Sequence, residues 1–194
     1  MRKLVVIEFL SLDGVMQGPG SPDEDREGGF EHGGWQQPYS DADLGKKAAQ
    51  GMAATDTYLF GRKTYEKMAA YWPTAPADDP MAAHLNATPK YVASRTLKTA
   101  DWQHTTVIEG DVVAAVTELK QKPGGTIAVL GSGDLVQTLM EHDLVDEYRL
   151  FVQPIVLGSG KRLFRGSDDV RRLRLIDSQT TGVGGLMLAY EPAR

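Results

Sequence analysis

Short apolar runs alternate with amphipathic stretches along the chain, a pattern that predicts alternating strands and helices. Residues 4–10 are an apolar run with a glutamate inside it and are predicted to be a strand. Residues 111–121 place apolar side chains on one helical face and end before Pro-Gly-Gly, which predicts a helix. By the same reasoning we expect helices over residues 41–52, 62–70 and 134–141, and strands over residues 57–60, 90–93, 105–108, 126–130, 147–156, 173–179 and 185–191.

The order of these elements predicts the fold class. Strands that alternate with helices indicate a parallel α/β sheet, whereas the last two strands, joined by residues 181–184, indicate an antiparallel hairpin. Pro154 suggests an edge or a bulge within the strand 147–156. We therefore expect a single domain, residues 1–194, with a mixed, mostly parallel sheet flanked by helices.

Residues 18–38 interrupt the pattern. This segment is crowded with Gly, Pro and acidic residues and shows neither helix nor strand periodicity. So long an irregular segment is usually a functional loop or a disordered one. It lacks the alternating ligands of a calcium loop, so we do not expect calcium there.

Composition narrows the classes of function. The chain has 194 residues, 41% of them hydrophobic and 24% charged, as in a globular domain with a full core. No apolar run approaches the roughly 20 residues of a membrane span. The net charge of −5 offers no basic footprint for nucleic acid. We expect a cytoplasmic protein without membrane or nucleic-acid partners.

Metal and nucleophile chemistry have little support in the sequence. The chain has no cysteine, which excludes disulfides, thiolate ligands and a cysteine nucleophile. Its four histidines lack the close helical spacing of a zinc site, so no metal is expected. A Gly-x-Ser-x-Gly elbow is also missing, which argues against a serine hydrolase.

Gly131-Ser132-Gly133 joins a predicted strand to a predicted helix. Glycine lets a ligand approach the backbone, and a helix N-terminus attracts phosphate. A Rossmann fingerprint would need a further glycine where Val136 stands. The turn is therefore either a structural connection or a phosphate site of another fold.

Two further strand ends strengthen the phosphate interpretation. Gly61 leads into Arg62 and Lys63, two cations in the first turn of a helix, where they oppose the helix dipole unless an anion binds or solvent screens them. Residues 94–96, Ser-Arg-Thr, end another strand with hydroxyl groups around an arginine. Because strand ends gather at one edge of an α/β sheet, these turns are expected to lie together. Residues 158–162, Gly-Ser-Gly-Lys-Arg, lack the spacing of a P-loop and are predicted to be a turn that lines the site at most.

The ordered set of motifs resembles the dihydrofolate reductase fold and, within it, the reductases of riboflavin biosynthesis. The resemblance covers nearly the whole chain. It is carried by residues 11–14 (SLDG), 60–66 (FGRKTYE), 90–97 (KYVASRTL), 130–133 (LGSG), 144–148 (LVDEY) and 154–160 (PIVLGSG).

This resemblance implies NADPH as hydride donor, and cofactor contacts from three segments. They are Gly61, Arg62, Lys63 and Thr64 at the adenosine-side phosphates, Ser94, Arg95 and Thr96 at the adenine ribose, and Gly131, Ser132, Gly133, Asp134 and Leu135 at the pyrophosphate. Either Arg95 or Arg62 would pair with the 2′-phosphate.

The substrate side departs from the folate pattern. Folate reductases carry Trp-x-x-Pro-x-Asp, and here Trp35 and Pro38 keep that spacing whereas the acid falls late. Asp41 or Asp43 would be the catalytic acid, or each is an ordinary acid at a helix N-terminus. Asp13 either caps a turn or reaches the substrate, and Trp35 is expected beside the substrate.

The resulting expectation is an NADPH-dependent reductase that transfers hydride to a small heterocycle. The best-matching acceptor is 5-amino-6-(5-phosphoribosylamino)uracil, as in riboflavin biosynthesis. Dihydrofolate reduction and a non-catalytic dinucleotide-binding module are the alternatives. The resemblance also implies a homodimer paired through an edge of the sheet, and a loop of residues 18–38 that closes over the substrate.

Overall fold

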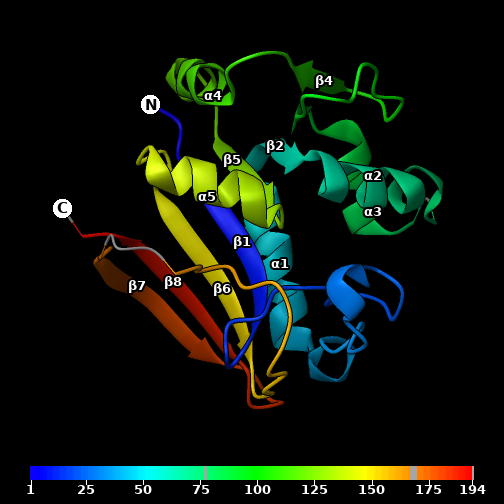
Figure 1. Ribbon diagram of the computed structural model, residues 1–194, viewed down its shortest axis with the longest axis vertical. Coiled ribbons are helices and arrows are strands. Elements are labelled where there is room, and N and C mark those ends of the chain that lie inside the picture. The colour runs from blue at the N-terminus through cyan, green and yellow to red at the C-terminus, as the bar shows by residue number, and fades with distance from the viewer. Residues whose placement is uncertain (77, 167–169, 194) are drawn as a thin grey trace. The chain divides into compact units, whose positions relative to one another are not determined.

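The computed structural model describes residues 1–76, 78–166 and 170–193 (Figure 1). Within this part of the chain, eight strands form one sheet in the order β4-β3-β2-β5-β1-β6-β8-β7. The strands are β1 Leu4–Ser11, β2 Thr55–Gly61, β3 Lys90–Ala93, β4 Thr105–Ile108, β5 Thr126–Leu130, β6 Glu147–Gln153, β7 Leu173–Thr180 and β8 Leu186–Pro192. The helices are α1 Ala42–Ala54, α2 Arg62–Tyr71, α3 Pro80–Ala87, α4 Val112–Gln121 and α5 Gly133–Glu141, with 3-10 turns η1 Glu27–Gly29, η2 Gln37–Tyr39 and η3 Trp72–Thr74.

The expected mixed sheet with a C-terminal antiparallel hairpin is present, and most element bounds agree with the sequence pattern. Two details differ. Helix α3 has no counterpart among the expected elements, and β6 ends at Gln153 instead of continuing through Pro154 to residue 156. Pro154 has no N–H to donate, and the N–H of Ile155 turns back to the carbonyl of Gln153 at 2.8 Å, so the ladder stops there.

Backbone contacts divide the chain into two compact units. The first consists of Met1–Val6 and Ala48–Val145, and the second of Ile7–Lys47 and Asp146–Arg194. The expected single domain stays a prediction.

The first unit is a parallel sheet with four helices that lie wholly within it. Strand β2 pairs in parallel with β3 and β5, and β3 pairs in parallel with β4. Apolar side chains of these strands are buried, among them Leu59, Phe60 and Val92. Lys90 is also fully buried. The burial of its ammonium is compensated by hydrogen bonds that it donates to the carbonyls of Leu85 and Thr88, each at 2.7 Å. This lysine therefore ties the C-terminus of α3 to the start of β3.

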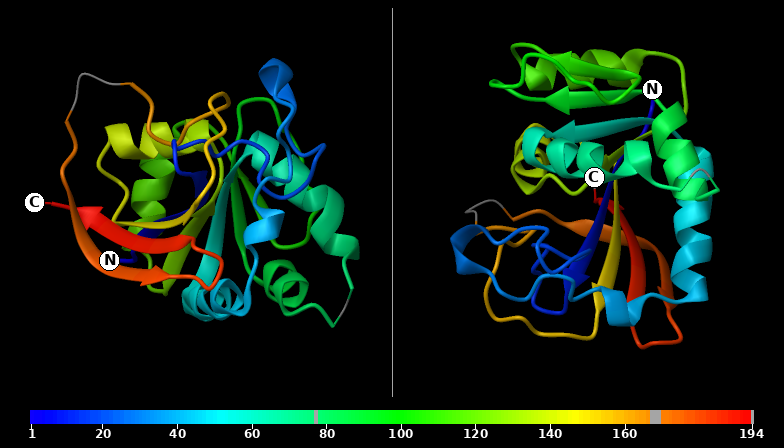
Figure 2. Two further views of the ribbon diagram at one scale, coloured as in Figure 1. Left: turned by 90° about the horizontal axis from the view of Figure 1, so that it is seen from below. Right: turned by 90° about the vertical axis from the view of Figure 1, so that its right-hand side faces the viewer.

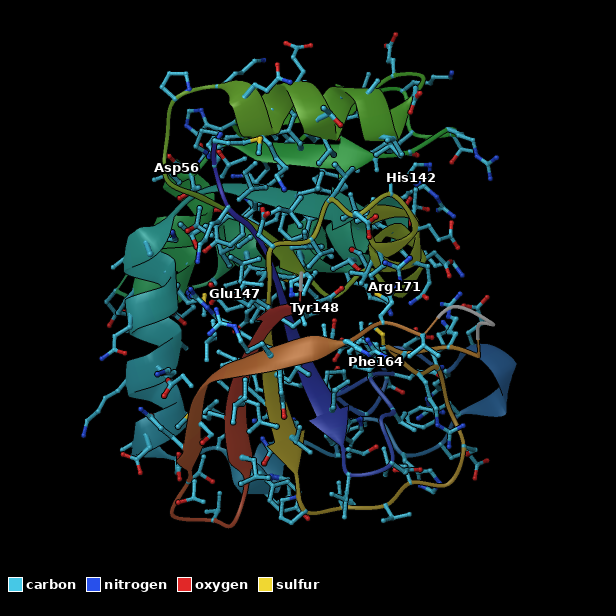
Figure 3. The ribbon with its side chains drawn as sticks, turned by 90° about the vertical axis from the view of Figure 1, so that its left-hand side faces the viewer. Asp56, His142, Glu147, Tyr148, Phe164 and Arg171 are labelled. Carbon is cyan, nitrogen blue, oxygen red and sulfur yellow. The ribbon has the colours of Figure 1, made fainter. Side chains whose placement is uncertain are left out.

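The second unit contains the antiparallel strands β6, β8 and β7, and Figure 2 shows the β7–β8 hairpin in orange and red. On one face Phe9 stacks on Phe151 with ring centroids 5.0 Å apart, next to Leu44 of α1. On the other face Tyr148 lies beside Phe164, with centroids 5.9 Å apart (Figure 3). Aromatic pairs thus pack both faces of β6.

Candidate functional site

The first unit gathers the glycine and hydroxyl turns at one edge of its parallel strands. Residue 61 pairs with 93 across β2 and β3, residue 93 pairs with 108 across β3 and β4, and residue 59 pairs with 129 across β2 and β5. Parallel strands in register end on the same side, so the segments after β2, β3 and β5 lie at one edge. All twelve residues expected to bind the cofactor belong to this unit.

Ser132 joins two of these turns. The backbone N–H of Gly61 donates to its hydroxyl oxygen at 2.8 Å, across 71 positions of sequence. A Cβ at position 61 would lie 3.4 Å from Oγ of Ser132, and one at position 131 would lie 3.5 Å from the side chain of Thr64. The β2–α2 and β5–α5 turns are therefore in direct contact.

The backbone at the β5–α5 turn is left-handed twice in succession, with φ of 59° at Gly131 and 69° at Ser132. Glycine adopts this conformation freely, whereas a serine held there is uncommon and costs free energy. Strain of this kind is often found at functional sites, where surrounding contacts hold it in place. Here the bond from Gly61 fixes the serine hydroxyl.

Two helices that begin at this edge have no side-chain cap in the described chain. Gly61 precedes α2 and Ser132 precedes α5, and neither supplies a capping hydrogen bond to its own helix. By contrast, Asp79 caps α3 and Asp111 caps α4, each accepting from two backbone N–H groups. An uncapped first turn presents N–H groups and a partial positive charge, which suits a phosphate group.

The cations at this edge differ in their pairing. Arg62 donates from Nη1 to both carboxylate oxygens of Glu66 at 3.0 Å, an ion pair one turn apart on α2. Arg95 is exposed, and its guanidinium has neither a hydrogen bond nor an ion pair with any residue the structure describes. Next to it, Oγ of Ser94 accepts from the N–H of Thr96 at 3.2 Å and of Leu97 at 2.9 Å, which fixes the turn. Arg95 is thus presented on an ordered turn.

The remaining expected cofactor residues fall in the first turns of α2 and α5. Lys63 and Asp134 are exposed, whereas the side chain of Leu135 is buried. Leu135 therefore has only its backbone N–H to offer a phosphate. An acid such as Asp134 in a first helical turn is favourable for the helix dipole by itself.

Asp13, in the second unit, is held by four groups. Its carboxylate accepts from the Ser11 hydroxyl at 2.7 Å, from the N–H of Leu157 at 3.1 Å and of Gly158 at 2.9 Å, and lies 3.5 Å from Arg162. The hydrogen bond from Ser11, followed by the backbone N–H groups, lowers the pKa of Asp13 to about 2. The carboxylate is therefore ionised at neutral pH and ties the loop after β1 to the segment after β6.

Asp41 caps α1. One carboxylate oxygen accepts from the N–H of Leu44 and the other from the N–H of Gly182, both at 2.9 Å. The helix-cap alternative therefore describes the contacts of Asp41, and its catalytic role stays a prediction. Asp43 lies exposed in the first turn of the same helix, 4.0 Å from the ammonium of Lys46.

Trp35 is buried among the apolar side chains of the second unit. It packs with Val15 and Phe30, and its indole N–H donates to the carbonyl of Gln17 at 2.8 Å. Trp35 is 6% exposed, so it supports the loop in which it lies, and its place beside a substrate stays a prediction.

No group of three or more metal-ligating His, Asp or Glu side chains lies within the described residues. In the same part of the chain, no helix combines the length and apolar character needed to cross a membrane.

The chain is also similar to known proteins. Its residues 2–187 match the family model of the RibD C-terminal domain. The chain belongs to the RibD C-terminal domain family.

Two uncharacterized proteins of Bacillus subtilis (strain 168) are similar to this member of the RibD C-terminal domain family. YyaP is 33% identical over 140 residues, 70% of this chain and 73% of YyaP. YwjB is 31% identical over 184 residues, 93% of each chain.

Solved structures share the fold. A Shewanella sp. PV-4 structure named as a riboflavin biosynthesis protein has a TM-score of 0.72 at 20% identity and covers 99% of both chains. Enterococcus faecalis dihydrofolate reductase, complexed with NADP(H), has a TM-score of 0.62 at 12% identity over 99% of this chain and 97% of that one. A Thermotoga maritima deaminase and 5-amino-6-(5-phosphoribosylamino)uracil reductase has a TM-score of 0.67 at 11% identity over 99% of this chain and 57% of that one. The expected dihydrofolate reductase-like fold is confirmed.

Three polar residues of this RibD C-terminal domain family member, the buried Glu8 and Gln17 and the partly exposed Lys161, have structural roles that the sequence pattern did not indicate. Gln17 and Lys161 bind the loop after β1, and Glu8 lies inside β1. The carboxyl oxygen Oε2 of Glu8 has no hydrogen-bond partner among the described residues, and burial raises the pKa of Glu8 well above its usual value. A glutamate within an apolar strand was the one available signal, because charged residues are rarely buried unpaired.

Proposed function

We propose that this protein is an NADPH-dependent reductase that transfers hydride to a small heterocyclic acceptor. The observation that carries the proposal is the edge of the first unit. There, two uncapped helix N-termini meet through the bond between Gly61 and Ser132, and the exposed Arg95 at the same edge has no partner among the described residues. Other members of the fold supply context: the structure of the Enterococcus faecalis relative contains NADP(H).

The residues at this edge fit a dinucleotide with several phosphate groups. The first turns of α2 and α5 offer backbone N–H groups without competing side-chain caps, and Gly61 and Gly131 leave the backbone open to a close approach. In the proposed complex, Gly61, Lys63 and Thr64 bind the adenosine-side phosphates. The pyrophosphate is bound by Gly131, Ser132, Gly133 and the backbone of Asp134 and Leu135. The bound cofactor supplies the hydride, and the protein supplies orientation and charge.

Arg95 is the preferred partner of the 2′-phosphate. Arg62 already has both oxygens of Glu66 as acceptors, so recruiting it would break an ion pair, whereas Arg95 is exposed without a partner among the described residues. Arginine binds phosphate through charge-assisted, paired hydrogen bonds. NADPH is therefore expected to bind more tightly than NADH, by about 10–100-fold for one such arginine.

The proposed acceptor is 5-amino-6-(5-phosphoribosylamino)uracil or a related ribosylamino-pyrimidine. The name of the Thermotoga maritima relative includes this activity. The late position of the acid and the use of both Asp41 oxygens in backbone bonds argue against a folate-type carboxylate at that residue. Asp13, Trp35, Asp41 and Asp43 remain the proposed substrate-side residues.

A non-catalytic dinucleotide-binding module is the second candidate. It is favoured by one observation: the carboxylates of Asp13 and Asp41 are both occupied by hydrogen bonds within the protein. Hydride transfer to any acceptor in a panel of pyrimidines and dihydrofolate would exclude this candidate. Cofactor binding without turnover across the panel would support it.

The test of cofactor binding is a parallel titration of NADPH and NADH by calorimetry and thermal shift. Arg95→Ala is expected to remove most of the preference for NADPH while leaving NADH binding nearly unchanged. Lys98→Ala is the matched control, since it removes an exposed cation three residues away that has no proposed contact. If Arg95→Ala lowers the affinity for both cofactors equally, Arg95 does not bind the 2′-phosphate. No binding of either cofactor to the wild type would refute the proposal.

We also propose that the protein is cytoplasmic and forms a homodimer, as the resemblance implies. The mass of one chain is 21.2 kDa. Light scattering after gel filtration is expected to give twice this mass, and a monomer mass at micromolar concentration would refute the dimer.

A further inference from the structure

Lys90 is a buried cation at the start of β3, in the first unit. Its side chain is fully buried, and its ammonium donates to the carbonyls of Leu85 and Thr88, each at 2.7 Å. No carboxylate of the described chain forms an ion pair with it. A charge buried without an opposite charge costs free energy, because neutral acceptors replace only part of its hydration. The ammonium would therefore gain hydration if the residues that cover it moved away.

Trp102 is part of that cover. Nζ of Lys90 lies 4.6 Å from the centroid of the Trp102 ring, and the attraction between a cation and a π face offsets part of the cost of burial. Trp102 is 3% exposed. Its indole N–H donates to the side-chain oxygen of Asn86 at 2.6 Å, and its backbone N–H donates to the hydroxyl of Tyr65 at 3.2 Å. Trp102 thus shields Lys90 from water and attaches its own segment to α2 and α3.

This segment, residues 94–104, connects β3 to β4. The two strands are parallel, so the chain returns from the end of one to the start of the other, and it does so without a helix or strand. Trp102 is the one buried residue among residues 94–104, all of which the structure describes. The attachment of the segment therefore depends strongly on the seat of Trp102 beside Lys90.

The charge of Lys90 changes close to neutral pH. Burial lowers its pKa from 10.5 to about 8. Burial also raises the pKa of Tyr58 in β2 and lowers the pKa of His84 in α3, so both are uncharged between pH 7 and pH 9. The other titratable groups that contact Trp102 or lie in its segment form no hydrogen bond or ion pair with the Lys90 ammonium; they are Tyr65, Arg95, Lys98, Asp101 and His104.

We propose that Lys90 is a proton-operated switch for residues 94–104: the charged ammonium favours opening of the Trp102 cover, and the neutral amine keeps the cover closed. A neutral amine retains two N–H groups, enough for the carbonyls of Leu85 and Thr88, so the closed contacts survive loss of the proton. The charged form gains water only when the cover opens. Because the closed state binds the proton more weakly, opening takes up a proton and is favoured as the pH falls.

The switch also concerns the proposed cofactor, and only this step rests on the proposed function. The segment begins with the turn that presents Arg95, and the bond from Trp102 to Tyr65 attaches it to α2, whose first turn is a further proposed phosphate site. NADPH bound at Arg95 is expected to favour the closed segment. Added NADPH should therefore reduce opening at pH 7, as a rise in pH does without it.

The test is amide hydrogen exchange of residues 97–104 at pH 7 and pH 9 without cofactor. Each rate is divided by the intrinsic rate of an unstructured chain at the same pH. When the segment closes faster than its amides exchange, this quotient gives the population of the open state. With a pKa of about 8 in the closed state and 10.5 in the open state, the open population is expected to fall about tenfold from pH 7 to pH 9.

Lys90→Met places an uncharged side chain of similar length at this position and is expected to abolish the pH dependence. Lys120→Met is the matched control, because it removes another buried lysine of the same unit, whose ammonium donates to the carbonyl of Leu144 at 2.7 Å. This control is expected to keep the tenfold change. An open population that is equal at pH 7 and pH 9 in the wild type would overturn the switch, even if Lys90→Met does not fold.

A second measurement follows the charge of Lys90 itself. In protein labelled with 5-fluorotryptophan at all three tryptophans, the ¹⁹F resonance of Trp102 is expected to titrate with a midpoint of about pH 8. The resonance of Trp35, in the second unit, is the internal control. A Trp102 resonance that does not titrate there, or that titrates equally in Lys90→Met, would overturn the switch. None of these results depends on NADPH, so a switch that operates without any response to NADPH would count against the proposed cofactor site alone.

Discussion

Glu8 places a carboxyl group inside β1, where it is 4% exposed and its Oε2 has no partner among the described residues. Burial raises its pKa well above the usual 4.5, with a smaller contribution from the charge of Glu24. The folded state therefore keeps the proton at pH values where the unfolded chain has lost it. The contribution of Glu8 to stability is present below pH 4.5 and decreases as the pH rises through the folded pKa.

Glu8→Gln is expected to remove this dependence, since glutamine has a similar shape and does not titrate. Below pH 4.5 the free energies of unfolding of the two proteins should differ little, and the variant should become progressively more stable than the wild type toward pH 8. Urea unfolding at a series of pH values measures this. A difference that stays constant with pH would show that Glu8 does not titrate as its burial indicates.

Asp41 supports a second prediction at the scale of a residue. Asp41→Ala removes the cap of α1 and the acceptor for the N–H of Gly182, so the free energy of unfolding is expected to fall by about 1–2 kcal/mol. Asp43→Ala, on the exposed first turn of the same helix, serves as the control and is expected to change it by less than about 0.5 kcal/mol. Thermal unfolding compares the two. Equal stability of both variants would contradict the structural role of Asp41.

Local sequence indicated the glycine turns but not the contacts between them. Gly61 and Gly131 were predictable because a tight turn after a buried strand calls for glycine. The bond from Gly61 to Ser132 was not, since it joins residues 71 positions apart, and neither was the left-handed backbone of a serine. The contacts of Gln17 and Lys161 were not predictable either, because their partners belong to an irregular loop without periodicity.

Element bounds were predictable wherever apolar residues set a clear period. Strands β3, β4 and β5 have the expected ends, and α1, α2, α4 and α5 differ from expectation by only a residue or two. Helix α3 was missed, although Asp79-Pro80 is a cap residue followed by proline at the first helical position. Its eight residues include two full turns only, too few for a periodic pattern to stand out.

The cap of α3 supports a prediction at the scale of an element. The carboxylate of Asp79 accepts from the N–H of Met81 at 2.7 Å and of Ala82 at 3.3 Å. Asp79→Ala should therefore lower the free energy of unfolding by about 1 kcal/mol. Asp78→Ala is the matched control, an exposed neighbour that caps no described helix. Denaturant unfolding measures the stability of the two variants. Equal unfolding midpoints for Asp79→Ala and Asp78→Ala would mean that the cap contributes little to α3.

At the scale of the whole molecule, the fold class followed from the order of elements, but the order of strands did not. Strand β5 lies between β2 and β1, and β8 lies between β6 and β7. Hydrophobic patterning indicates which face of a strand is buried and does not name its neighbour. The glycine and hydroxyl turns were nevertheless expected to lie together, because strand ends gather at one edge of an α/β sheet whichever strands are neighbours.

The proposed cofactor should therefore stabilise the protein as a ligand of the folded state. At a free NADPH concentration of 100 times Kd, linkage adds about 2.7 kcal/mol to the free energy of unfolding, and for a chain of this size the rise in Tm is about 5–10 °C. NADH at the same concentration should raise Tm by clearly less. In Arg95→Ala, the rises in Tm caused by the two cofactors should become nearly equal. The rise with NADPH should also continue with the logarithm of its concentration once the site is saturated. A rise that stops at saturation, or one of equal size with NADH, would count against a site at this edge that reads the 2′-phosphate.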